Sequence, residues 1–130
     1  MCPLIKNPDA DIATDVRDEV KHLVDEMGQV IVHCTYVSPT GGDGIRIWPS
    51  TYLFDHHSDH VSTLVHAEKI TLYPVWTLTK RGDNQFTLIF TGLPKSCTLF
   101  DLIEDCNGAP GSFRQMNMRR NRDDIYFVSI

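Results

Sequence analysis

The sequence predicts an all-β protein, and more narrowly a two-sheet antiparallel β-sandwich of the immunoglobulin-like kind. Two apolar, β-rich runs flank the polar segment 80–84, so residues 71–93 have the pattern of a β-hairpin. Within each run, side chains of different character alternate, and alternate side chains of a strand point to opposite faces. Turn signals recur along the rest of the chain at short intervals. This spacing favours a sandwich over a parallel sheet covered by helices.

Length and composition predict one domain spanning residues 1–130, with residues 1–10 as a flexible N-terminal segment. The chain is 42% hydrophobic and 22% charged, which is ordinary for a globular protein. No apolar run approaches the ~18 residues of a membrane span. The formal net charge of -5 disfavours nucleic acid and anionic lipid as partners.

The first residues lack the basic and apolar regions of a secretory signal. We therefore expect a cytoplasmic protein, or a cell-envelope protein if an export leader has been removed. In the second case Cys2 would stand where a bacterial lipoprotein carries its lipidated cysteine. The four cysteines allow three complete pairings; Cys34 is expected to be a buried thiol, and a bridge from Cys97 to Cys106 requires the chain to reverse between them.

Residues 11–27 allow two interpretations. Apolar residues follow a helical stripe between a candidate N-cap, Asp11, and a candidate stop, Gly28; they are Ile12, Val16, Val20, Leu23, Val24 and Met27. The end of this segment and residues 29–37 also fit two strands around a turn at 25–28. The residues alone leave helix and strand equally favoured.

The middle of the chain alternates turns and strands. Residues 38–44 have turn composition, and the strand expected over 45–54 is an edge strand or breaks at Pro49, which cannot donate a ladder hydrogen bond. Residues 55–59 are polar and predict a turn. Residues 61–70 predict a weaker strand or a crossing loop into the hairpin.

The last third of the chain predicts further strands. Residues 97–104 fit either a helical turn or a strand with Phe100 and Leu102 facing inward. Residues 113–118 and 125–130 are predicted to form a closing pair of strands, joined by a polar turn.

The string Phe86-Thr-Leu-Ile-Phe-Thr-Gly-Leu-Pro-Lys-Ser-Cys-Thr-Leu-Phe-Asp-Leu-Ile-Glu104 resembles immunoglobulin-like β-sandwich domains of bacterial cell-envelope proteins. The earlier segment Thr51-Tyr-Leu-Phe-Asp55 is similar to another strand of those domains, so the resemblance covers roughly residues 20–130. It implies an accessory or interaction module without catalytic residues, and it favours a strand over 19–24. The histidine-rich turn departs from the pattern of the family.

The densest polar cluster is the run Asp55-His-His-Ser-Asp-His60. Imidazole and carboxylate groups suit zinc or another divalent metal, so His56, His57 and His60 are candidate metal ligands. The spacing matches no established metal signature, and a solvated polar turn explains the same residues. No other cofactor is predicted.

Other segments also have two interpretations. Arg81-Gly82-Asp83 coincides with an integrin-binding tripeptide, but turn chemistry accounts for both Gly82 and Asp83. The basic run 118–122 suits an anion, although two adjacent aspartates offset its charge. Trp48 and Trp76 are candidates for stacking on a sugar, with Trp76 expected in the core because its neighbours alternate.

No nucleophile elbow, phosphate-binding glycine loop or paired-carboxylate motif occurs, so the sequence predicts no enzyme. We expect a non-catalytic binding or interaction module that pairs with a protein partner or with itself through a sheet edge or loop. The alternative is a sandwich that binds a metal at the histidine turn or a carbohydrate on exposed aromatic rings. An enzyme whose site is assembled from distant residues is a third hypothesis.

Overall fold

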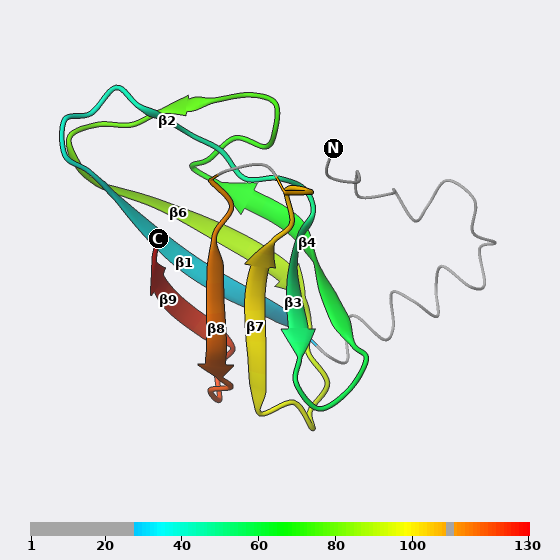
Figure 1. Ribbon diagram of the computed structural model, residues 1–130. Coiled ribbons are helices and arrows are strands. Elements are labelled where there is room, and N and C mark those ends of the chain that lie inside the picture. Colours follow the sequence, from blue (N-terminus) through cyan, green and yellow to red (C-terminus); the bar gives the residue numbers. More distant parts are fainter. Residues whose placement is uncertain (1–27, 109–110) are drawn as a thin grey trace.

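The computed structural model describes residues 28–108 and 111–130, and their regular secondary structure consists of strands. This confirms the all-β class for the described residues (Figure 1). The strands are β1 (Gln29–Ser38), β2 (Gly44–Ile45), β3 (Thr51–Asp55), β4 (Val61–Glu68), β5 (Thr77–Leu78), β6 (Gly82–Thr91), β7 (Leu99–Glu104), β8 (Arg114–Arg119) and β9 (Ile125–Ser129).

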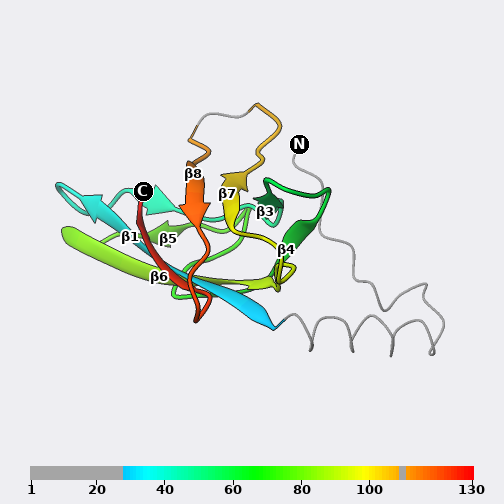
Figure 2. The same ribbon diagram turned by 90° about the horizontal axis from the view of Figure 1, so that it is seen from below.

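Seven strands form one sheet in the order β8-β7-β3-β4-β6-β1-β9, and β2 pairs with β5 in a separate small sheet. Neighbouring strands are antiparallel except β1 and β9. The large sheet curls until it is nearly closed into a barrel, as the two views in Figures 1 and 2 show. The expected two-sheet sandwich is not confirmed. The reason is that β4 pairs with both β3 and β6 and so joins all seven strands, while a bulge between Leu64 and His66 bends β4.

Alternating side chains fill the interior of this barrel. Cys34 shares the inner face of β1 with Val30 and Val32, as predicted, and burial raises the pKa of its thiol to about 12. Aromatic residues near the two edges of the sheet also meet, since the rings of Phe100 on β7 and Tyr126 on β9 lie edge to face with centroids 5.1 Å apart. The remaining fully buried aliphatic and aromatic residues of the sheet are Leu53, Leu88, Phe90 and Leu102.

The predicted hairpin over 71–93 is wrong in its pairing. β6 forms as expected, but its neighbours are β1 and β4, whereas β5 pairs with β2. Pro74 has no N–H to donate and interrupts the first run before it can join a ladder. The core position expected for Trp76 is also wrong, because this side chain is 56% exposed.

Several local predictions are confirmed. The strand over 45–54 breaks at Pro49, since β2 ends at Ile45 and β3 begins at Thr51. Residues after Asp55 form a turn, and β4 shows that the weaker run is a strand. Of the two interpretations of residues 97–104, the strand is correct, with Phe100 and Leu102 fully buried.

The closing strands form but do not pair with each other. β8 pairs with β7, and β9 runs parallel to β1. Backbone hydrogen bonds attach the connection between β8 and β9 to other strands and loops. Ile31 N–H donates to the Asp124 carbonyl at 2.9 Å, and Arg120 N–H donates to the Thr98 carbonyl at 2.9 Å. These contacts direct the chain across the end of the barrel instead of into a tight hairpin.

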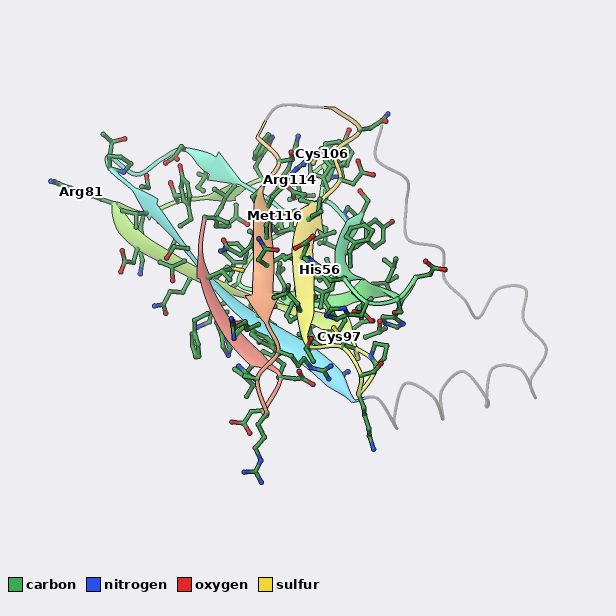
Figure 3. All side chains as sticks on the ribbon, turned by 60° about the horizontal axis from the view of Figure 1, so that its bottom comes forward. His56, Arg81, Cys97, Cys106, Arg114 and Met116 are labelled. Atoms are coloured by element: carbon green, nitrogen blue, oxygen red, sulfur yellow. The ribbon has the colours of Figure 1, made fainter. Side chains whose placement is uncertain are left out.

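Residues 1–27 lie outside the described part of the chain, and with them the flexible N-terminal segment, the choice between helix and strand over 11–27, and Cys2. Within the described residues, no helix is both long and apolar enough to cross a membrane. Cys34, Cys97 and Cys106 are buried and form no disulfide. Cys97 and Cys106 flank β7 at its opposite ends (Figure 3), so the reversal that a bridge requires is not made.

Candidate ligand pocket at the mouth of the barrel

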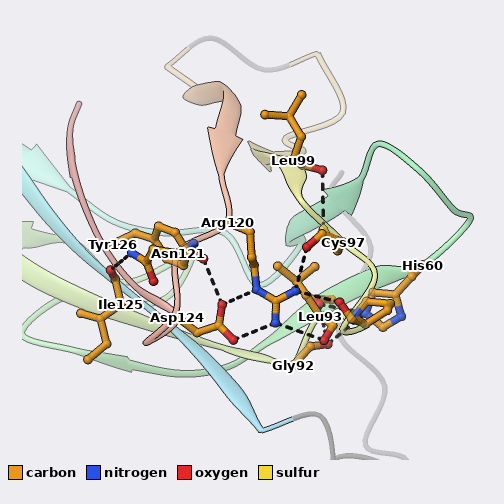
Figure 4. A network of polar contacts seen from close by, with 12 residues as sticks. His60, Gly92, Leu93, Cys97, Leu99, Arg120, Asn121, Asp124, Ile125 and Tyr126 are labelled. Atoms are coloured by element: carbon orange, nitrogen blue, oxygen red, sulfur yellow. Dashed lines mark hydrogen bonds and ion pairs between the residues drawn. The ribbon is translucent and has the colours of Figure 1, made fainter.

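The two ends of the barrel differ, and one of them is closed by Arg120 (Figure 4). The guanidinium of this residue forms a two-pronged ion pair with Asp124, in which Nη2 lies 2.8 Å from Oδ2. It also donates to the carbonyl oxygens of Pro94, at 2.7 Å, and Cys97, at 3.2 Å. Arg120 therefore ties the β8–β9 connection to the β6–β7 connection.

The pKa of Arg120 is raised, first by its hydrogen bond to Asp124 and against the effect of its burial. Tyr126 extends the network, since its hydroxyl donates to Asp124 Oδ1 at 3.0 Å. The sequence suggested a polar turn here, with a basic run suited to an anion. The structure instead uses one of these arginines, 16% exposed, as a structural cross-link.

The other end of the barrel is open and holds a pocket of about 610 Å³, here called the mouth pocket. This volume falls in the range of about 300–1,000 Å³ that is usual for small-molecule sites, which often lie in barrel mouths. The ends of β1, β6, β7, β8 and β9 surround it. Its apolar lining residues are Ile45, Ile47, Ile70, Phe86, Phe113 and Ile130.

A two-stranded ribbon made of residues 42–48 and 71–79, here called the mouth ribbon, borders the pocket. It contains the β2–β5 pair and continues irregularly, because Tyr73 N–H donates to the Ile47 carbonyl at 2.9 Å. Asp43 fastens the ribbon to the barrel, because its carboxylate accepts hydrogen bonds of 2.6 and 2.5 Å from the hydroxyls of Tyr36 and Ser38 on β1. A third bond of 2.5 Å, from the Thr79 hydroxyl, lies within the ribbon. The bonds from Ser38, Thr79 and Tyr36 hold the pKa of Asp43 well below its ordinary value.

Arg46 and three aromatic rings form a stack on the mouth ribbon. The Arg46 Cζ atom lies 3.6 Å from the ring centroid of Trp76 and 4.6 Å from that of Tyr73, and the Tyr73 ring stacks on Trp48 at 3.8 Å. Gly44 makes room for this arrangement, because a Cβ atom there would lie 2.9 Å from Trp76 Cε3. Arg46, Trp48 and Trp76 all line the pocket.

A buried carboxyl group, that of Glu104, completes the polar part of the pocket. Only 4% of Glu104 is exposed, and Oε2 accepts a hydrogen bond of 2.9 Å from Trp48 N–H. Burial raises the pKa of this group, although its bonds from Trp48 N–H and the Cys106 thiol and the charge of Arg46 act in the opposite direction. The pocket thus combines apolar walls with one guanidinium and one desolvated carboxyl, as binding sites commonly do.

The three histidines of the polar turn have three different partners. His56 Nε2 lies 2.7 Å from Asp101 Oδ1, His57 Nε2 lies 3.0 Å from Thr98 Oγ1, and His60 Nε2 lies 3.0 Å from the Gly92 carbonyl. Across the described residues, no group of three or more His, Cys, Asp or Glu side chains is arranged to hold a metal ion. Metal binding at His56, His57 and His60 stays a prediction, which equilibrium dialysis with zinc tests.

Asp55 shapes this turn. Its carboxylate accepts hydrogen bonds from His57 N–H at 2.9 Å and the Ser58 hydroxyl at 2.5 Å. Burial acts to raise the pKa of Asp55, but these bonds outweigh it and lower the pKa overall. Such capping by an aspartate explains the turn without a metal.

The remaining sequence candidates lie apart from the pocket. Arg81 does not line the pocket and projects at the tip of the β1–β6 pair (Figure 3), and Gly82 has a φ of 91°, a backbone conformation that the turn requires. Sequence reasoning singled out Trp48 and Trp76 but missed Arg46 and Glu104. A weak signal existed in the Arg46-Ile-Trp48 alternation, which places both side chains on one side of the strand.

Comparisons of the chain with protein-family models, with curated proteins and with solved structures found no match.

Proposed function

We propose that this protein is a non-catalytic binding domain that takes a small, largely apolar ligand into the mouth pocket. The observation that carries the proposal is the pocket itself, where apolar walls meet Arg46 and Glu104 at an open barrel end. The core below is filled by side chains, so the mouth is the place for a ligand. The exposed Trp76 ring of the mouth ribbon would cover the ligand from one side.

A neutral fluorescent probe, N-phenyl-1-naphthylamine, tests this function, because its emission rises in apolar sites. We expect saturable binding at about one probe per chain. Ile130→Trp should fill the pocket and weaken probe binding roughly tenfold or more. Val65→Trp is the matched control, since Val65 is 49% exposed on β4 and lies outside the pocket. Equal loss in both variants, or no saturable binding in the unaltered protein, would contradict the proposal.

A second candidate function is association with a protein partner or a second copy through β9, in the manner of the envelope accessory domains that the sequence resembles. β9 is an edge of the large sheet and presents Phe127, which is 79% exposed, and Ile125, which is 38% exposed. Light scattering tests self-association. A dimer that Phe127→Ser converts to a monomer would support it, whereas a monomer at all concentrations would leave only a different protein as partner.

A further inference from the structure

The mouth pocket contains one cation, the guanidinium of Arg46, and this group already contacts aromatic rings. Arg46 lies over Trp76 and Tyr73, so these rings already hold a positive charge. A cationic ligand would have to displace the guanidinium from both rings. The stack therefore disfavours cationic ligands and orients Arg46 for another kind of contact.

The hydrogen-bonding edge of the same guanidinium is largely unused. Its Nη1 donates to the Pro74 carbonyl at 3.2 Å, and within the described residues this is its single hydrogen bond. A guanidinium has five N–H donors in a planar fork, and this geometry matches a carboxylate. Arg46 lines the pocket, so these donors are available to a ligand there.

The surroundings of Arg46 limit the charge that the ligand can carry. The pocket has mainly apolar walls, and the buried Glu104 adds no positive charge to them. A doubly charged phosphate would leave one negative charge uncompensated beside the single guanidinium, which is costly in a desolvated site. A singly charged head group at Arg46, with its chain directed along Ile47 and Phe86, meets both requirements.

We propose, on the basis of the pocket-binding function above, that the ligand is an apolar molecule ending in a carboxylate, which Arg46 binds at the pocket mouth. Its hydrocarbon part lies against Ile47, Phe86 and Phe113. The Trp76 ring holds the guanidinium in place and covers the head group. Fatty-acid-like and aromatic carboxylates belong to this class, and neutral sugars do not.

A matched pair of ligands, octanoate and 1-octanol, tests the proposal by displacement of N-phenyl-1-naphthylamine at pH 7.5 and low salt. Their chains are equal in length, so a difference in affinity reports the head group. We expect octanoate to bind roughly tenfold or more tightly than 1-octanol. Raising the salt concentration should reduce this ratio, because screening weakens the ion pair.

The variant Arg46→Gln should lower the affinity for octanoate to that for 1-octanol and leave 1-octanol binding within about twofold. Arg119→Gln is the matched control, because Arg119 is exposed at the other end of β8 and outside the pocket; it should keep the full ratio. If Arg46→Gln also loses 1-octanol, Arg46→Lys, which keeps the charge, should restore binding of both ligands; failure to do so would contradict the role given to Arg46.

Equal affinities of octanoate and 1-octanol for the unaltered protein would overturn the carboxylate proposal and leave the pocket function intact. Probe binding that neither ligand reverses would overturn it as well. Failure of the probe itself to bind would instead contradict the proposed function. The two claims are therefore separated by measurements on the unaltered protein.

Discussion

Glu104 is the residue whose ionisation is most closely linked to the proposed site. Its pKa is raised mainly by burial, so the folded protein takes up a proton more readily than the unfolded chain. Between the ordinary carboxyl pKa and this raised value, the native state binds more protons than the unfolded state. The free energy of unfolding contributed by Glu104 therefore falls as pH rises through that window.

We expect Glu104→Gln to remove this decline, because the amide does not ionise. The difference in melting temperature between the variant and the unaltered protein should shift in favour of the variant as pH rises from 4.5 to 7.5. Calorimetry at several pH values measures it. Asp59→Asn, at an exposed carboxyl in the turn after β3, is the control and should show no such trend. A variant that loses stability most at high pH would contradict the assignment.

Arg120 is the residue on which the closed end of the barrel depends. Replacing it by Met keeps much of the side-chain length but removes the ion pair with Asp124, which keeps its hydrogen bond from the Tyr126 hydroxyl, and the guanidinium donors to the carbonyls of residues 93, 94 and 97. We expect Arg120→Met to lower the free energy of unfolding by about 2–4 kcal/mol, and Arg119→Met to change it by about 0.5 kcal/mol or less. Urea denaturation compares the two. Equal effects would show that the cross-link contributes little.

At the scale of elements, the mouth ribbon is the part of the molecule that the sequence did not predict. Strand periodicity was visible in residues 71–78, but it cannot say which strand is the partner. Because Pro74 interrupts this run and β5 is short, the run pairs with β2 and not with β6. The alternation that suggested a buried Trp76 is real, yet it belongs to a ribbon with one open face.

Asp43 should control how firmly this ribbon is attached, since two hydroxyls of β1, those of Tyr36 and Ser38, donate to its carboxylate. We expect Asp43→Ala to increase hydrogen exchange at the Gly42 and Thr79 amides by roughly tenfold or more, with little change in β6. Asp83→Ala, on the neighbouring strand β6, is the control. Unchanged exchange in the ribbon would contradict its attachment through Asp43.

The long strands were easier to predict. β1 and β6 follow from regular alternation, and the break at Pro49 follows from its missing N–H, whereas the sequence left β7 open between a strand and a helical turn. The existence of β8 and β9 was also visible, but their separate partners were not. Contacts such as that of Arg120 with Pro94 join residues far apart in sequence, and periodicity contains no information about them.

For the whole molecule, the nearly closed sheet explains why the mouth pocket lies at an end of the barrel. A sandwich would bury its core between two open sheets, whereas this barrel has two ends that must each be covered. One is closed by Arg120 and its partners, and the other is bordered by the mouth ribbon with Arg46 and Glu104 inside. Composition and charge could not predict this asymmetry, because it arises from strand order.

An NMR titration of the isotope-labelled protein with N-phenyl-1-naphthylamine tests ligand binding at the mouth pocket most directly. We expect saturable shifts of the Trp48 and Trp76 indole signals and of the amides of Gly44 and Phe113, all at the mouth pocket. Shifts confined to the outer face around Phe127, or no saturable shift at all, would contradict it.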